Sequence, residues 1–217
     1  MTFYSVFQPI WDLKTNIIHG HEALLRGNAP PEDLFKRASE TNKLVELDSL
    51  AHTLALTTFC GEGRLFLNLH PKTLEKGFKI DLSEFNIDPT KVVIEITEHE
   101  ILNESTAKKN IKDIKNIGIK IAVDDFGHGF TNLSLIEWTQ PNYIKLDRSL
   151  IKDIHSKTLH PLLRGLNQIA ANIGSELVAE GIETKEQLDF VKYCGIKFGQ
   201  GFLLGRPKQM KEIKITG

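Results

Sequence analysis

Short apolar runs rich in β-branched residues alternate with longer segments of helical periodicity from about Arg64 onward. Apolar runs separated by amphipathic helical segments are typical of repeated βα units that build a parallel sheet. The predicted strands of these units are Leu65–Leu69, Val92–Ile96, Ile119–Val123, Tyr143–Leu146, Leu177–Ala179 and a weaker run near Phe198.

Two further strand patterns come before the βα units. Phe7–Ile10 and Ile17–Leu25 flank the polar stretch 12–16, and this arrangement predicts an antiparallel pair joined by a turn. Pro30-Pro31 then begins a mainly helical region. The pair and the six later runs make eight strands, the number that closes a barrel without an aqueous channel. We therefore predict an α/β barrel in a single domain over residues 1–217, because no proline-rich or low-complexity linker interrupts the series.

Two of the intervening segments have a clear apolar face. Ser105 is predicted to cap the first helix and Gly118 to end it, with Ile111, Ile114 and Ile117 facing inward. Pro161 is predicted to open the second helix and Gly174 to follow its end. The inward residues of this second helix are predicted to be Leu162, Leu163, Leu166, Ile169 and Ile173.

A polar residue stands at or just after the end of each predicted strand. In a parallel barrel these ends converge on one mouth, where the βα loops build the active site. A convergent group of carboxylates repels itself unless cations are present, and hard oxygen ligands suit Mg²⁺ or Mn²⁺. The sequence therefore predicts a metal site at the mouth where these residues meet: Glu22, Asn68, Glu95, Asp124, Asp125, Lys145, Asp147, Glu180 and Gln200.

The pair Asp124-Asp125 sharpens this prediction. Neighbouring carboxylates can bridge or separately hold two ions roughly 3.5–4 Å apart, as in two-metal phosphoryl chemistry. Lys145 could then hold or activate the attacking water, or neutralise a phosphate. Each residue alone has a simpler role, because a strand-end Asp is more often a helix cap and a lone Lys more often an exposed charge. Their recurrence at successive strand ends favours a functional site.

The charge balance limits the ligands that such a site can serve. The chain has 27 basic and 28 acidic residues, so it has no bulk positive field for a long nucleic acid, although a small anionic ligand remains compatible.

The first residues lack the pattern of a signal peptide, and no apolar run is long enough to cross a bilayer. We therefore expect a cytoplasmic protein with no membrane insertion. Cys60 and Cys194 are far apart and are expected to stay reduced.

The histidines suggest an alternative metal site. His19-Gly20-His21 resembles the H-x-H pair of barrel metallohydrolases, and such a site would suit zinc. The later strand ends carry Glu, Asp and Asn without a lysine-then-histidine succession, which argues against this alternative. We interpret most histidines, including His70 and His99, as structural or rim residues, with His128 as the best exception.

Several blocks of the sequence make a more specific pattern together than any of them does alone. The tripeptide Glu22-Ala23-Leu24 arises often by chance, but the further blocks cover nearly the whole chain. These blocks are Phe7–Ile10, Glu95–Glu98, Asp124–Gly129, Lys145–Ser149, Val178–Thr184, Gly199–Phe202 and Arg206-Pro207. In type and order they resemble the blocks of the EAL-domain cyclic di-GMP phosphodiesterases.

This resemblance implies a fold and an activity. The fold would be a TIM-like (β/α)8 barrel with an antiparallel first strand. The activity would be metal-dependent cleavage of one 3′–5′ phosphodiester of cyclic di-GMP, with release of linear 5′-pGpG. The cofactors would be Mg²⁺ or Mn²⁺, as two ions.

The resemblance also implies residue roles. One ion would be held by Glu22, Asn68, Glu95 and Asp124, and the second by Asp124, Asp125 and Glu180. The catalytic residues would be Lys145, Glu180, Glu98 and Asp147, with Lys145 positioning the nucleophilic water and Glu98 steadying the loop after Asp125. The substrate contacts would come from Gln8, Leu24, Arg26, Asn68, Asp147, Glu183, Gln200 and Arg206.

Other functions remain open beside the enzyme. The same barrel could serve as a non-catalytic receptor for cyclic di-GMP or as a module that binds a partner protein. A purely structural scaffold explains none of the strand-end carboxylates. The resemblance further implies a homodimer with the region 125–135 near its interface, and we expect regulation through expression, self-association or another protein.

Overall fold

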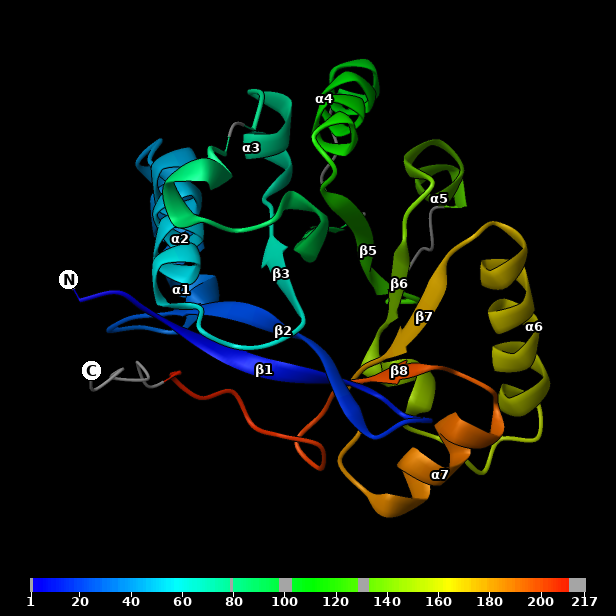
Figure 1. Cartoon of the computed structure of the whole chain (residues 1–217). Helices are drawn as coiled ribbons and strands as arrows, with labels where there is room; N and C mark the ends of the chain where they lie inside the picture. The colour runs from blue at the N-terminus through cyan, green and yellow to red at the C-terminus, as the bar shows by residue number, and fades with distance from the viewer. Residues whose placement is uncertain (1, 79, 98–102, 129–132, 211–217) are drawn as a thin grey trace.

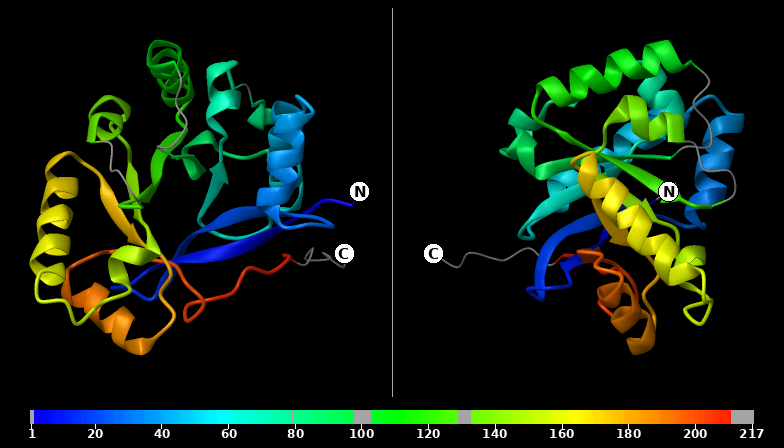
Figure 2. Two further views of the ribbon diagram at one scale, coloured as in Figure 1. Left: turned by 180° about the vertical axis from the view of Figure 1, so that it is seen from behind. Right: turned by 90° about the vertical axis from the view of Figure 1, so that its right-hand side faces the viewer.

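The computed structural model describes residues 2–78, 80–97, 103–128 and 133–210. In this part of the chain a closed barrel of strands runs in chain order, with helices around its outer face (Figures 1 and 2). The strands are β1 (Tyr4–Asp12), β2 (Ile17–Arg26), β3 (Arg64–Asn68), β4 (Val92–Thr97), β5 (Lys120–Phe126), β6 (Tyr143–Leu146), β7 (Glu176–Ala179) and β8 (Phe198–Gly199). β1 pairs antiparallel with β2 and β8, whereas the pairs from β2 to β8 are parallel. The predicted barrel and its antiparallel first strand are confirmed.

The helices follow the strands that the apolar runs predicted. Pro31 stands at the first position of α1, where its missing N–H removes no intrahelical bond. Short 3₁₀ helices supplement the longer ones in the βα connections: η1 (Leu82–Phe85), η2 (Pro89–Lys91) and η3 (Arg148–Ile151). The α-helices are α1 (Pro31–Glu40), α2 (Leu44–Thr58), α3 (Pro71–Glu75), α4 (Glu104–Asn116), α5 (Leu133–Thr139), α6 (Leu159–Asn172) and α7 (Lys185–Tyr193). No helix in the described ranges is both long enough and apolar enough to span a membrane.

The start of α4 corrects one detail of the sequence prediction. Asn103, and not Ser105, caps this helix, because the Asn103 side chain accepts the backbone N–H of Thr106. The Ser105 hydroxyl donates instead to Asn103 Oδ1 at 2.9 Å. Gly118 ends the helix as predicted, with φ +94°, a conformation that glycine adopts without strain.

The inward faces of the two helices are narrower than predicted. On α4, Ile111 and Ile114 are buried, but Ile117 lies at the helix end and is exposed. On α6, Leu163 is fully buried and Leu166 packs against the same cluster. Three residues predicted to face inward are instead exposed, with relative accessibilities of 52% for Leu162, 57% for Ile169 and 47% for Ile173.

The barrel interior is filled by one apolar layer. In a barrel this size, side chains that point inward fill the lumen in layers. The layer consists of Ile10, Phe66, Val93, Ala122, Tyr143, Val178 and Phe198. Along the parallel strands, the polar residues of the predicted site stand two positions later, so they face the same lumen one layer closer to the C-terminal mouth.

A bulge in β2 changes which of its side chains enter the lumen. The pairing with β1 shifts between Ile10 and Trp11, so His19 has no opposite residue in the ladder. The His19 ring stacks on Phe198 with ring centroids 3.9 Å apart. This contact lies inside the lower end of the barrel, which is the end opposite the C-terminal mouth of the parallel strands. Glu22 also faces the lumen, three residues later, whereas a regular strand would place His19 and Glu22 on opposite faces.

Candidate metal centre and active site

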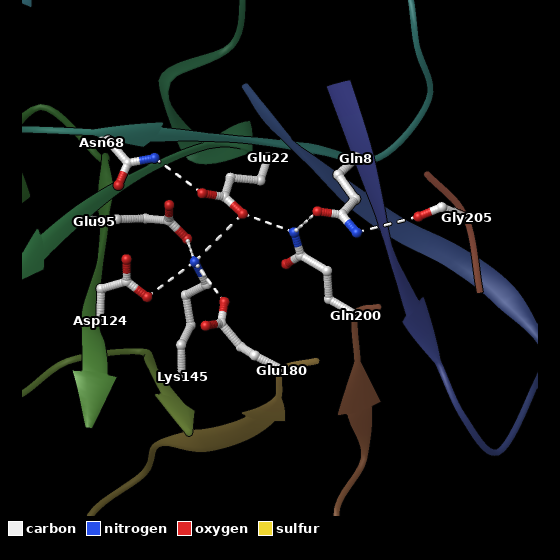
Figure 3. A network of polar contacts seen from close by, with 9 residues as sticks. All are labelled: Gln8, Glu22, Asn68, Glu95, Asp124, Lys145, Glu180, Gln200 and Gly205. Carbon is white, nitrogen blue, oxygen red and sulfur yellow. Dashed lines mark hydrogen bonds and ion pairs between the residues drawn. The ribbon is translucent and has the colours of Figure 1, made fainter. Parts of the chain in front are cut away.

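A buried lysine gathers the predicted carboxylates at the C-terminal mouth. Lys145 Nζ lies 2.8 Å from Glu95 Oε1, 2.9 Å from Asp124 Oδ1 and 2.9 Å from Glu180 Oε1. Glu22 Oε2 is slightly farther away, at 3.5 Å (Figure 3). These five side chains come from β2, β4, β5, β6 and the residue after β7, so the barrel brings together residues far apart in the sequence.

Amide side chains hold the Glu22 carboxylate from two sides. Asn68 Nδ2 donates to Glu22 Oε1 at 2.9 Å, and Gln200 Nε2 donates to Glu22 Oε2 at 2.6 Å. Gln200 Nε2 also donates to Gln8 Oε1 at 3.0 Å. Gln8 in turn donates to the Gly205 carbonyl at 3.1 Å (Figure 3). Glu22 therefore has a fixed orientation before any ligand arrives.

The end of β5 brings two consecutive carboxylates to the mouth. Neighbouring residues of a regular strand point to opposite faces. Here the ladder to β6 is irregular between Val123 and Phe126, and Asp125 has φ +55° in the left-handed region, which Asp tolerates better than most residues. Both Asp124 and Asp125 consequently border the same cavity.

Burial and mutual repulsion change the pKa values of this cluster. Burial raises the pKa of Glu180 to about 8 and also raises the pKa of Asp124, although the Lys145 charge opposes both shifts. Burial raises the pKa of Glu95 well above its usual value. For Glu22, burial alone would raise the pKa, but the Lys145 ammonium and the amide donors lower it. Burial alone would lower the pKa of Lys145, yet the surrounding carboxylates raise that pKa well above its ordinary value.

The oxygen atoms of this cluster fit a hard divalent cation. Carboxylate oxygens of Asp124, Asp125 and Glu180 lie within 4.8 Å of one another. Within the described residues, Glu95 Oε2 and Gln200 Oε1 are buried without a hydrogen-bond partner. A divalent cation would compensate the carboxylates that one lysine leaves in excess, and buried oxygens without donors are suitable ligands for it or for its water.

A polar cavity of about 290 Å³ lies over this cluster. Asp125, Glu183 and Gln200 border it, together with Arg148, whose side chain brings positive charge to the rim. A cavity with a negative floor and a cation at its rim can accept a ligand that is itself anionic, provided that metal ions lie between the floor and the ligand.

A second cavity of about 270 Å³ adjoins the first, and Glu22 and Leu24 line both. Its walls are mostly apolar and include Phe35 from α1 and Ala51 from α2. Arg26 also lines it. The Arg26 guanidinium donates to its neighbour's carbonyl, Leu25 O, at 2.8 Å.

Asp147 and Arg206, two further predicted site residues, contact groups outside the Lys145 cluster. Asp147 caps η3, accepting the Ser149 N–H at 2.9 Å, and its Oδ1 lies 3.5 Å from His128 Nδ1. The Arg206 guanidinium lies 4.2 Å from the ring centroid of Phe202, which borders the polar cavity. Glu98 lies outside the described residues.

The alternative zinc site is not assembled by the described histidines. The bulge separates His19 from His21: His19 Nε2 lies 3.0 Å from the Tyr143 hydroxyl at the lower end of the barrel. His21 packs beside Phe59, with ring centroids 5.9 Å apart. His70 caps α3 by accepting the Lys72 N–H.

Sequence reasoning missed two buried polar residues beside the site. Asp48 and His52 lie one turn apart on α2, with relative accessibilities of 2% and 5%, and both line the second cavity. The available signal was two polar residues that interrupt the apolar face formed by Leu44, Leu47 and Ala55. A charged residue on the apolar face of a helix is seldom fully buried without a partner, so this interruption could have indicated a role.

Comparison with known families and structures agrees with this arrangement. The EAL domain family matches residues 1–207. The probable cyclic di-GMP phosphodiesterase PdeN of Escherichia coli strain K12 is 31% identical over 230 residues, which cover 97% of this chain and 44% of PdeN.

Solved structures share the fold. Klebsiella pneumoniae BlrP1, in a manganese and cyclic di-GMP complex, has a TM-score of 0.86 and 29% identity, covering 96% of this chain and 56% of that one. A standalone EAL protein from Vibrio cholerae O395, in its c-di-GMP-bound form, has a TM-score of 0.83 and 24% identity, covering 95% of this chain and 92% of that one. At that identity the second likeness shows the fold alone. The chain spans 44% of the length of PdeN and 56% of that of BlrP1.

Proposed function

The chain belongs to the EAL-domain family, and on this premise we propose that it is a metal-dependent phosphodiesterase that hydrolyses cyclic di-GMP to linear 5′-pGpG in bacterial second-messenger signalling. The names of relatives support the substrate, since PdeN is named a probable cyclic di-GMP phosphodiesterase and BlrP1 was solved with cyclic di-GMP. We also propose that residues 1–217 act as one EAL domain in the cytoplasm.

The observation that carries the proposal is the cluster around Lys145. Three carboxylates lie within 2.9 Å of its ammonium, two of them buried and that of Glu180 partly buried, and a fourth lies at 3.5 Å. Burying several like charges is costly, and a receptor that only bound an anionic nucleotide would gain nothing from a negative floor. A hydrolase that uses divalent cations needs such a floor.

The proposed ion ligands are those that the family resemblance implies, and the cluster of Asp124, Asp125 and Glu180 supports the second set. One ion would take oxygens from Glu22, Asn68, Glu95 and Asp124, and a second would take Asp124, Asp125 and Glu180, with Mg²⁺ or Mn²⁺ as the cofactor. When bound, these ions supply positive charge to the phosphoryl oxygens and lower the pKa of water. Gln200 orients Glu22 through its amide, and this orientation is supported by Gln8.

Lys145 is the proposed positioning group for the attacking water. Its raised pKa keeps it protonated, so it can donate a hydrogen bond but cannot accept the proton of the water. Glu180 adjoins the polar cavity, and its carboxylate can accept a proton, which makes it the better-placed proton acceptor.

The two adjoining cavities fit a ligand with two bases. We propose that one guanine enters the apolar cavity beside Phe35, where Arg26 would meet a phosphate. The scissile phosphate would then lie over the carboxylate cluster, and Glu183 and Arg206 would contact the remainder from the rim of the polar cavity. Leu24, which lines both cavities, would separate the two halves of the ligand.

The test is incubation of the purified protein with cyclic di-GMP and Mg²⁺ or Mn²⁺, followed by chromatography of the nucleotides. We expect pGpG as the end product and no hydrolysis after exhaustive chelation. Ca²⁺ should support hydrolysis poorly, because it prefers a looser and larger oxygen shell than Mg²⁺ or Mn²⁺. Binding of cyclic di-GMP without hydrolysis, with both Mg²⁺ and Mn²⁺, would instead favour the receptor function.

We also propose a homodimer with the region 125–135 near its interface, and regulation by a partner protein. Part of that region lies outside the described residues, but Leu133 on α5 is 67% exposed. α6 follows α5 around the barrel and presents the exposed Leu162 and Ile169 (Figure 1). Light scattering at concentrations where the protein is fully active tests this proposal, and a strict monomer would refute it.

A further inference from the structure

The end of β3 is held by side chains from α2 and not only by neighbouring strands. The parallel pairing of β3 with β2 ends at Leu67 opposite Ala23. The Leu69 N–H still donates to Glu95 O in β4, at 2.9 Å. Because successive residues of a strand direct their backbone groups to alternate sides, the Asn68 carbonyl points toward the β2 side, where the ladder has ended.

His52 donates a hydrogen bond to this carbonyl. Its Nε2 atom lies 2.7 Å from Asn68 O, and since a carbonyl can only accept, the His52 Nε2–H donates. The ring also packs edge-on against Phe78, with centroids 5.1 Å apart, which limits its rotation. His52 is therefore fixed in a tautomer and an orientation that serve Asn68.

Asp48 lies one helical turn before His52 on α2 and contacts the backbone after Leu69. Its Oδ2 accepts the His70 N–H at 3.1 Å, and its Oδ1 lies 3.9 Å from His52 Nε2. Asp48 and His52 thus hold the backbone on both sides of Leu69, where the chain leaves the barrel.

The Asn68 side chain depends on this anchoring because packing does not hold it. Asn68 is exposed, although Leu67 before it and Leu69 after it are buried. Its Nδ2 donates to Glu22 Oε1 at 2.9 Å (Figure 3), and this leaves Oδ1 available to a cation. A small backbone rotation at residue 68 would move this amide away from Glu22.

We propose that His52 and Asp48 are positioning residues that hold Asn68 in place as a ligand of the metal ion. The inference rests on the metal site of the proposed function and names the residues that prepare it. Partners that orient a metal ligand typically contribute about 10- to 100-fold in metal affinity. A pair that served stability alone would change the free energy of unfolding without changing this affinity.

Calorimetric titration of the purified chain with Mn²⁺ measures the metal affinity and tests the proposal without nucleotide. His52→Leu removes the donor at similar size and should weaken Mn²⁺ binding by roughly 10- to 100-fold. His52→Gln can place an amide N–H near the Nε2 position and should bind Mn²⁺ close to the wild-type affinity. His52→Asn, whose amide reaches only the Nδ1 position, should behave like His52→Leu and replaces it if that variant does not fold.

His19→Leu is the matched control, because it removes a partly buried histidine with a polar contact at the opposite end of the same barrel. It should keep wild-type Mn²⁺ affinity. The proposal is overturned if folded His52→Leu or His52→Asn binds Mn²⁺ like wild type, if His52→Gln is as weak as His52→Leu, or if His19→Leu loses as much affinity. A wild-type protein that binds Mn²⁺ but does not hydrolyse cyclic di-GMP would refute the proposed activity and leave this inference intact.

Discussion

The two ends of the barrel are lined by the same strands but hold opposite chemistry. The lower end packs aromatic and aliphatic side chains around His19, and the upper end gathers four carboxylates and one lysine. A step of two residues along a strand separates the ends. The lower and upper members are Phe66 and Asn68, Val93 and Glu95, Ala122 and Asp124, Tyr143 and Lys145, Val178 and Glu180, and Phe198 and Gln200.

This difference shows how one barrel divides stability from chemistry. The lower layer gains free energy by removing apolar surface from water. The upper layer buries charges whose desolvation is costly, and the proposed metal ions would offset that cost. Substitutions at the two ends should therefore affect different measurements.

The largest effect is expected from the upper carboxylates. Asp124→Asn should remove metal-dependent hydrolysis below detection, because it withdraws an ionic ligand that both ions would share. Its amide oxygen can still accept from Lys145, so the barrel should stay folded. Glu22→Gln should have the same effect on hydrolysis at some cost in stability, because its NH₂ would face an amide donor from Asn68 or Gln200.

Chromatography of the nucleotides and circular dichroism of both variants check this prediction. Near wild-type hydrolysis by either variant would contradict the assignment of the upper end as the metal site.

Lys145 should give the next largest effect. Lys145→Ala removes the hydrogen-bond donor proposed to position the water, and kcat should fall on the order of a hundredfold. Mn²⁺ binding should be largely kept, because the carboxylates remain. Steady-state kinetics at saturating Mn²⁺, with Mn²⁺ titration beside them, separate the two quantities. An unchanged kcat would show that Lys145 does not position the attacking water.

A change at the lower end should alter stability alone. Phe198→Leu keeps the site apolar but loses the stacking on His19, so the free energy of unfolding should fall by about 1 kcal/mol. Mn²⁺ affinity should not change. Urea unfolding and Mn²⁺ titration measure the two quantities, and a large loss of Mn²⁺ affinity would show that the ends are coupled.

A pH-dependent effect on stability is expected from the protonation of His19. Burial, with the charges of Arg64 and Lys197 adding to it, lowers the pKa of His19 from 6.5 to about 4. The unfolded chain then binds more protons than the folded one between these values, so stability should fall as the pH drops from about 6.5 to about 4.

His19→Gln keeps a polar contact for the Tyr143 hydroxyl but cannot titrate, so its unfolding midpoint should decline less over this range. Urea unfolding at several pH values compares the two proteins. Equal slopes would exclude His19 as the source of the pH dependence.

On the outer helices, local sequence patterns were insufficient to predict the cap residue of α4 and the buried face of α6. Ser105 and Asn103 are both good helix caps, and the choice between them depends on the path of the preceding loop. On α6, the apolar residues at helical spacing cover a wider arc than the barrel buries, so Ile169 and Ile173 remain at the surface. Periodicity predicts that a helix exists, but the neighbouring elements decide how much of its face is covered.

The sequence by itself determined the order of the strands, the antiparallel opening pair and the kind of residue at each strand end. These features depend on short-range periodicity and on residue type, which a single chain displays directly. Only the tertiary structure decided that a bulge turns both His19 and Glu22 into the lumen, and that Asp125 joins Asp124 at one cavity. It also brought His52 of α2 to the Asn68 carbonyl. The reason is physical: backbone irregularities and contacts between distant segments depend on how the whole barrel closes, and no local pattern in the chain carries that information.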